Sequence, residues 1–149
     1  TLFFCAGNLA ETLGIHKVSE MNGVGRRMPW TMAAFVVGGL SLIGIPGTAG
    51  FTSKWYLISA SLELGGAGWL LVVVIVVGSL MAVAYIWRVV EAAWFREPQG
   101  DHAGVTEAPA LMLAVTWLAA FANIYFGLSP SLQSRLASDG ARLMLGELP

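Results

Sequence analysis

Long apolar stretches separated by short polar segments dominate the chain. Residues 28–53, 64–87 and 108–134 contain no Asp, Glu, Lys, Arg or His. Each stretch is longer than the roughly 20 residues that an α-helix needs to cross the hydrocarbon core of a bilayer. An apolar segment at 1–13 is too short to span, and we interpret it as the end of a truncated first helix. The pattern predicts an all-α integral membrane protein with about three full transmembrane helices plus this truncated one.

The helices expected from this pattern occupy most of the chain. They lie at about 1–13, 30–45, 51–64, 69–90 and 108–128, within a transmembrane region 1–128. The tail, 129–149, mixes leucines with charged residues and is expected to form a short amphipathic helix at the membrane interface. Its apolar and charged positions are Leu132, Leu136, Leu143 and Leu145, with Arg135, Asp139, Arg142 and Glu147.

The second span is expected to be broken. A straight helix over residues 30–64 would be about 52 Å long, far more than the roughly 30 Å of the hydrocarbon core. Glycine loosens a helix and proline removes a backbone donor. The residues of this kind inside the span are Gly44, Pro46, Gly47 and Gly50. We therefore predict two half-helices with an unwound stretch near 46–50, a feature that transporters use for ion sites.

The composition excludes several classes of function. Hydrophobic residues make up 56% of the chain and charged residues 11%, whereas a soluble domain carries about a quarter charged residues. A net charge of −1 with scattered basic residues argues against nucleic-acid binding. One cysteine, Cys5, and two distant histidines, His16 and His102, do not make a metal site within the chain. Since no nucleotide-binding motif is present either, we expect no cofactor, no bound metal and no enzymatic activity.

Basic residues predict the orientation of the chain. Segments 14–29 and 91–107, with the end of the third span, hold five lysines or arginines, and the opposite side holds two. The five are Lys17, Arg26, Arg27, Arg88 and Arg96, and the two are Arg135 and Arg142. By the positive-inside rule, 14–29 and 91–107 are expected to face the cytoplasm, with the chain crossing the inner membrane several times.

Lys54 is the only charged residue between Arg27 and Glu63. Counted back from Leu64, it lies about 15 Å from the far surface of the membrane, which is mid-depth. A charge at that depth costs on the order of 3 kcal/mol, and a lysine held away from water gives up its proton more readily. The alternative is that Lys54 lies near a helix end and its stem lifts the ammonium to the interface. The depth favours a proton relay.

Three hydroxyl groups lie close to Lys54 in the sequence. They belong to Thr48, Thr52 and Ser53, beside or within the predicted break. These hydroxyls, with carbonyl groups freed around Pro46, are suited to hold the water that a relay needs. Bonding of each hydroxyl to the helix backbone is an equally good interpretation, and the sequence leaves both open.

Other polar residues in the apolar spans have structural interpretations. Arg88 and Glu91 stand three residues apart at the end of the third span and are expected to form an interfacial ion pair. Asn8 and Asn123 are expected to bond to neighbouring helices rather than to an ion.

Three segments have a familiar form: LFFCAG at 2–7, MNGVGRRMP at 21–29 and LSLIGIPGTAGFTSK at 40–54. Together they resemble the proton-conducting antiporter-like membrane subunits. That family includes the D subunit of multisubunit monovalent cation/proton antiporters and the proton-pumping membrane subunits of respiratory complex I. The stretches SKWYL at 53–57 and YIWRVVE at 85–91 look closest to the D subunit of the antiporters.

The resemblance implies a fourteen-helix fold with two inverted five-helix repeats, each containing a broken helix. Our broken span looks like that of the second repeat, and Lys54 matches its charged residue, which serves proton transfer toward the outer face. The first element looks like the end of the preceding helix, whose proton-carrying lysine and histidine would lie before Thr1. The chain is thus expected to be a C-terminal fragment. Many relatives have two prolines where this chain has Pro46 and Gly47.

The function expected from these observations is proton translocation within a multisubunit sodium (monovalent cation)/proton antiporter, with Lys54 as a relay. The first alternative is a proton-pumping membrane subunit of a complex I-like NADH-quinone oxidoreductase or hydrogenase. The second is a structural scaffold subunit. The expected partners are other membrane subunits, the lipid bilayer, protons and a monovalent cation.

Overall fold

This computed structural model describes residues 1–63, 65–97 and 107–144. Helices make up this part of the chain almost entirely. In chain order they are α1 (Leu2–Leu13), the 3-10 helix η1 (Val18–Glu20), α2 (Val24–Arg27), α3 (Pro29–Ile43), α4 (Ala49–Glu63), the 3-10 helix η2 (Gly65–Ala67), α5 (Gly68–Phe95), α6 (Ala110–Leu128) and α7 (Ser131–Met144). The predicted all-α fold and the interrupted second span are both confirmed.

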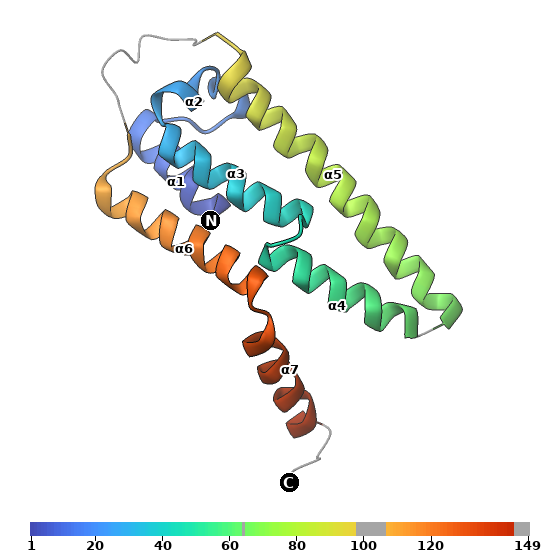
Figure 1. The fold of residues 1–149 in the computed structure, drawn as a ribbon. Coiled ribbons are helices and arrows are strands. Elements are labelled where there is room, and N and C mark those ends of the chain that lie inside the picture. Colours follow the sequence, from blue (N-terminus) through green and yellow to red (C-terminus); the bar gives the residue numbers. More distant parts are fainter. Residues whose placement is uncertain (64, 98–106, 145–149) are drawn as a thin grey trace.

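The two half-helices lie at the centre of the arrangement. α4 continues the path of α3 after a short connection, and α5 runs back along both of them (Figure 1). α6 contacts both half-helices as well, and α1 packs against α3 and α6. Within the described residues, α5 and α6 are each long and apolar enough to cross a membrane, and α1 and α3 are shorter apolar helices. The break is therefore surrounded by helices rather than placed at the end of the bundle.

Helix α5 extends five residues beyond the end expected at residue 90. Its last two turns pack against α2, and Ala92 and Ala93 are only 2% and 0% exposed. The backbone N–H of Gly23 donates to the Ala92 carbonyl at 3.1 Å. Gly25 lies directly under the Trp94 ring, where a Cβ would clash with the indole. These contacts account for the extra helical turn, because they give its small and aromatic side chains a buried surface.

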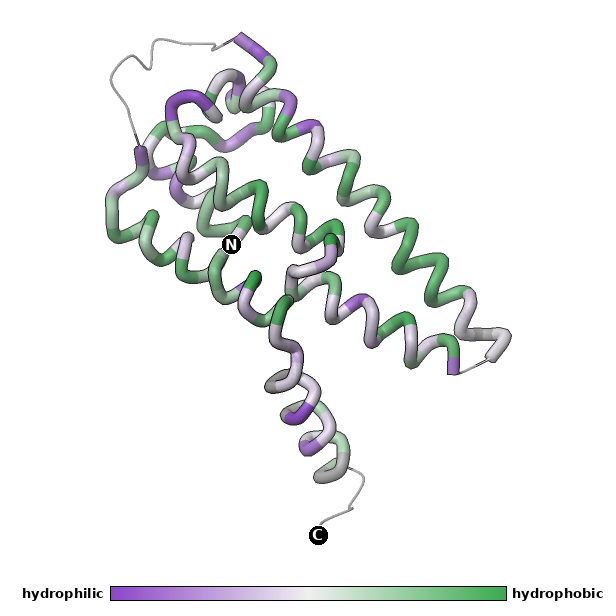
Figure 2. The backbone as a smooth tube through the Cα atoms, viewed as in Figure 1, coloured by the Kyte–Doolittle hydropathy of each residue, from purple (hydrophilic) through white to green (hydrophobic). Residues whose placement is uncertain are grey.

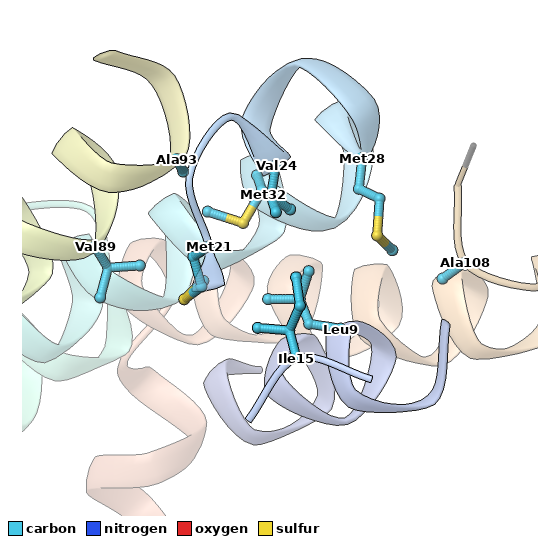
Figure 3. Packing of buried hydrophobic residues seen from close by; sticks show 9 residues of the cluster. All are labelled: Leu9, Ile15, Met21, Val24, Met28, Met32, Val89, Ala93 and Ala108. Atoms are coloured by element: carbon cyan, nitrogen blue, oxygen red, sulfur yellow. The ribbon is translucent and has the colours of Figure 1, made fainter. Parts of the chain in front are cut away.

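A cluster of buried apolar side chains joins α1, α2, α3 and α5 at this end of the molecule (Figure 3). It contains Leu9, Ile15, Met21, Val24, Met28, Met32, Val89, Ala93 and Ala108. Hydrophilic positions gather around η1, α2 and the C-terminal end of α5, whereas the middle of α5 is hydrophobic (Figure 2). Segment 14–29 and the described start of segment 91–107 thus lie at the same end of the bundle.

The N-terminus of α3 is capped from a distant part of the chain. Pro29 occupies its first turn, and the Glu107 carboxylate accepts hydrogen bonds from the N–H groups of Trp30 and Thr31 at 2.9 and 3.3 Å. The Thr31 hydroxyl donates to the same carboxylate at 2.6 Å. A negative charge at a helix N-terminus satisfies free N–H groups and complements the helix dipole. The sequence contained no local signal for this cap.

The tail forms a helix, α7, between Ser131 and Met144. Of the positions expected to be amphipathic, Leu145 and Glu147 lie outside the described residues, as do the side chains of Leu132, Leu136, Arg142 and Leu143. Segment 98–106 of the predicted polar loop, with His102, also lies outside them.

Candidate functional site at the helix break

The break between α3 and α4 runs from Gly44 to Thr48, two residues earlier than the sequence predicts. Gly44 has a φ of 93° and Gly47 a φ of 91°, so both adopt the left-handed conformation that favours glycine. Gly44 ends α3 as a left-handed C-cap, and its N–H donates to the Leu40 carbonyl at 3.0 Å. Gly50 lies in the first turn of α4 instead of in the unwound stretch.

Lys54 reaches from α4 back to the end of α3. Its Nζ donates to the carbonyl oxygens of Leu42 and Ile43 at 2.6 and 3.1 Å, and to the hydroxyl oxygen of Ser79 at 2.7 Å. An ammonium has three donors, and these three oxygens can occupy all of them. The last carbonyls of α3 have no partner within the helix, and the dipole makes that end negative, so both effects favour the ammonium there.

The absence of a side chain at Gly44 leaves room for the Lys54 side chain to reach the end of α3. A Cβ at position 44 would lie 3.1 Å from the Lys54 Cδ atom, closer than ordinary van der Waals contact. The glycine therefore has two roles at this position, because it ends α3 in the left-handed conformation and leaves space for the lysine stem.

Ser79 is a site residue that the sequence analysis missed. It lies on α5, and its hydroxyl donates to the Ile75 carbonyl at 3.0 Å, which leaves its oxygen free to accept from Lys54. The available signal was a lone serine in the apolar stretch 64–87. Spacing along the chain did not connect it to Lys54, because the two residues are 25 positions apart and meet only when α5 folds back along α4.

Lys54 lines two cavities. One, of about 710 Å³, extends between α1, α3 and α4, and its polar lining includes Ser41, Ser53, Tyr85 and Asn123. The other, of about 280 Å³, lies between α4 and α5 and is lined mostly by apolar side chains together with Ser79. Lys54 is the residue that the two linings share.

The three hydroxyls expected beside Lys54 divide into two kinds. The Thr48 hydroxyl donates to the Ile45 carbonyl at 2.7 Å, and the Thr52 hydroxyl donates to the Gly127 carbonyl at 3.3 Å. Both threonines are buried and bond to backbone, which is the second interpretation that the sequence left open. Ser53 is exposed and lines the larger cavity with Lys54.

Asn123 of α6 holds the start of α4 against the end of α3. Its Oδ1 accepts hydrogen bonds from the Ser41 hydroxyl at 2.8 Å and from the Ala49 N–H at 3.2 Å. The Gly50 N–H donates in turn to the Ser41 hydroxyl oxygen at 3.1 Å. Asn123 thus bonds to neighbouring helices as predicted, and Asn8 does so too, through a 3.1 Å bond from its Nδ2 to the Thr116 hydroxyl.

The predicted pair between Arg88 and Glu91 is wrong. Among the described residues, Glu91 forms its ion pair with Arg96, at 3.3 Å between Arg96 NH2 and Glu91 Oε1. Arg88 instead lines a small cavity with Val18 of η1. The extension of α5 to Phe95 carries Arg96 within reach of Glu91, and this competing partner was not foreseen from the expected helix end. The described ranges hold no group of three or more His, Cys, Asp or Glu side chains that lie together.

Comparison with protein families gives one match that covers more than half of the chain. Residues 1–82 match the model described as NADH:quinone oxidoreductase/Mrp antiporter, TM. The NADH-quinone oxidoreductase subunit N of Desulforudis audaxviator (strain MP104C) is 38% identical over 139 residues, which cover 85% of this chain and 27% of that protein. The F(420)H(2) dehydrogenase subunit L of Methanosarcina mazei is 33% identical over 134 residues, covering 85% of this chain and 20% of its own length. The chain therefore spans between a fifth and about a quarter of these relatives.

Two solved structures share the fold. A chain of the membrane-bound sulfane sulfur reductase, described as an archaeal respiratory membrane complex, superposes with a TM-score of 0.79 at 30% identity, covering 89% of this chain and 22% of that one. A chain of the Mrp complex from Dietzia sp. DQ12-45-1b superposes with a TM-score of 0.78 at 21% identity, covering 95% of this chain and 34% of that one. The second likeness is one of fold alone.

Proposed function

The chain belongs to the NADH:quinone oxidoreductase/Mrp antiporter family of transmembrane proteins, and from this membership we propose that it is part of a proton-translocating membrane subunit of a redox-driven complex. Lys54 relays protons at the helix break in this proposal. The chain lies in a membrane that it crosses several times, with other membrane subunits as its neighbours and with the redox chemistry on those partners. The membrane is the inner one, and segments 14–29 and 91–107 face the cytoplasm.

One observation carries the proposal: the Lys54 ammonium is held by three oxygens, and the Lys54 side chain lines two cavities. A lysine charge deep in a bilayer is costly, so such residues are paired and line transport paths. Here the carbonyl groups at the end of α3 stabilise the charged form, and the two cavities that Lys54 lines offer space for water. A proton received from one cavity and released into the other completes a transfer step.

The geometry argues against the snorkelling alternative. A snorkelling lysine extends toward the nearest interface and places its ammonium among headgroups. The Lys54 side chain instead turns back along the break, and its nitrogen is occupied by the end of α3 and by Ser79 of α5. Such contacts support a role for the lysine inside the protein.

The named relatives favour the redox-driven alternative over the antiporter that the sequence analysis put first. The relatives at 38% and 33% identity carry the names of oxidoreductase and dehydrogenase subunits. The support for an antiporter is the mention of Mrp in the family description and a structure of an Mrp complex at 21% identity. Cation/proton antiport remains the second candidate, because the family model covers both kinds of complex.

The test is a Lys54→Met substitution in the assembled complex, reconstituted into vesicles. Acidification of the vesicle lumen is followed while electrons are supplied to the complex and, in a separate arm, while a sodium gradient is imposed. We expect Lys54→Met to abolish electron-driven proton uptake. If Lys54→Met loses proton uptake only when a sodium gradient drives it, the complex is an antiporter instead.

The matched control is Lys17→Met, which removes the other lysine of the chain, an exposed residue before η1. It should leave proton uptake unchanged. If Lys54→Met also leaves uptake unchanged in both arms, at equal amounts of assembled complex, the relay is refuted and the scaffold interpretation stands.

A further inference from the structure

Ser79 differs from the other two groups that hold Lys54. Two of the three oxygens around its Nζ are backbone carbonyls, and the third is the Ser79 hydroxyl. A carbonyl only accepts hydrogen bonds, whereas a hydroxyl both donates and accepts and is free to rotate. Ser79 is therefore the one partner that is able to change its bonding when Lys54 changes its protonation state.

The need for such a partner follows from the chemistry of the relay. An ammonium offers three donors, which match the three oxygens, but a neutral amine offers two donors and one lone pair. With three acceptors around the neutral amine, the nitrogen lone pair would face the lone pair of one oxygen, and that contact would be repulsive. Rotation of the Ser79 hydroxyl removes this mismatch, because its hydrogen then points at the Lys54 nitrogen.

The rotation has a small cost within α5. The Ser79 hydroxyl now donates to the Ile75 carbonyl at 3.0 Å, and it would give up that bond. The same carbonyl still receives the backbone N–H four residues later in the helix, so it is not left without a partner. Of the residues that line the smaller cavity, Ser79 alone carries a hydroxyl, so no neighbour there substitutes for it.

We propose that Ser79 is a positioning residue that bonds Lys54 in both of its protonation states, and that it thereby sets the pH range over which Lys54 releases its proton. The inference rests on the proposed function, since it has a consequence only if Lys54 relays protons.

Few other titratable groups approach Lys54. α3 carries none, and α6 carries only Tyr125. Tyr85 of α5 lines the larger cavity with Lys54. The remaining titratable residues of the packed helices are Cys5 and Glu11 on α1, Tyr56 and Glu63 on α4, and Arg88 and Glu91 on α5, and none of them lines either cavity.

The test compares Ser79→Ala with Ser61→Ala in the assembled complex. Both serines donate to the carbonyl four residues earlier, Ser79 to Ile75 and Ser61 to Leu57, so the two substitutions remove the same intrahelical bond. Only Ser79 also contacts Lys54. Proton uptake is measured as a function of pH for both variants and for Ser79→Thr, which keeps the hydroxyl.

We expect Ser79→Ala to move the alkaline limb of the profile toward lower pH by about one unit. The ammonium loses a charge-assisted hydrogen bond to the hydroxyl, and this bond is worth more than the neutral bond that the amine loses. The maximal rate should fall several-fold, because the lysine is less well positioned. Ser79→Thr should keep the wild-type profile, and so should Ser61→Ala.

A Ser79→Ala profile that superimposes on that of Ser61→Ala refutes the inference. A loss of rate that is equal at every pH refutes it too, since a packing role would have that effect. Neither outcome affects the proposed function, which fails only if Lys54→Met retains proton uptake.

Discussion

Gly50 lies where the first turn of α4 passes against the last turn of α3, and alanine at this position would test how closely the two half-helices are held. A Cβ on residue 50 would overlap the Ser41 carbonyl oxygen and would lie 2.9 Å from the Ser41 hydroxyl oxygen. Backbone does not move aside as a flexible side chain does. The start of α4 must therefore shift away from α3, and the 3.1 Å bond from the Gly50 N–H to Ser41 is lost.

The expected size of the effect follows from three contributions. Overpacking costs typically about 1–3 kcal/mol, and the lost hydrogen bond adds about 1 kcal/mol. Alanine offsets up to about 1 kcal/mol of this because it is the better helix former. We therefore expect Gly50→Ala to lower the free energy of unfolding by about 1–3 kcal/mol. Since the shift of α4 also moves Lys54 relative to the α3 carbonyls that hold it, proton uptake should fall too.

The assay is thermal unfolding of the assembled complex in detergent, followed by circular dichroism. Gly78→Ala is the matched control, because it lies in the middle of α5 with nothing within 4 Å of the added Cβ. This control should unfold at the same temperature as the wild type or slightly higher, and Gly50→Ala several degrees lower. Equal stability of the two variants would refute the close approach of the half-helices at this point.

Three further substitutions or titrations address the same architecture. Asn123→Ala removes the acceptor of the Ser41 hydroxyl and of the first N–H group of α4, and should destabilise the protein by about 2–3 kcal/mol in the same unfolding assay. Glu107→Ala exposes the N-terminus of α3 and should cost about 1–2 kcal/mol, with faster hydrogen exchange confined to the first turn of that helix. The Glu20 carboxylate accepts hydrogen bonds from the backbone N–H groups of His16 and Lys17. These two bonds lower the pKa of Glu20 below the ordinary 4.5. The bonds should therefore be fully present above pH 4.5 and be lost as the pH falls through the lowered pKa, and an NMR titration of the Glu20 carboxyl carbon checks this.

The apolar pattern was sufficient to predict the helices and the break. Charge-free stretches as long as a bilayer is thick leave few alternatives to helices, because every backbone group must be satisfied within the segment. Gly44, Pro46 and Gly47 act on their own backbone, so their effect on α3 is visible without knowledge of the rest of the fold. For the same reason the scarcity of charge was enough to single out Lys54.

The sequence was weaker where two similar local choices compete. Glu91 has two arginines nearby in the sequence: Arg88, three residues before it, and Arg96, five residues after it. Which of them pairs with Glu91 depends on how far α5 continues. That continuation is set by packing of Ala92 and Ala93 against α2, which a local pattern does not contain.

The tertiary structure alone decided which groups meet at the site. Ser79 bonds Lys54 across 25 residues, Asn123 caps α4 across 74, and Glu107 caps α3 across 76 or more. Hydrophobicity and backbone propensity act over a few neighbouring residues, so they are readable in the sequence. A hydrogen bond between two helices depends on the rotation and depth of both, and these are determined only when the helices pack. For this chain, the sequence determined that a lysine lies beside a broken helix, and the packing determined which oxygens hold it.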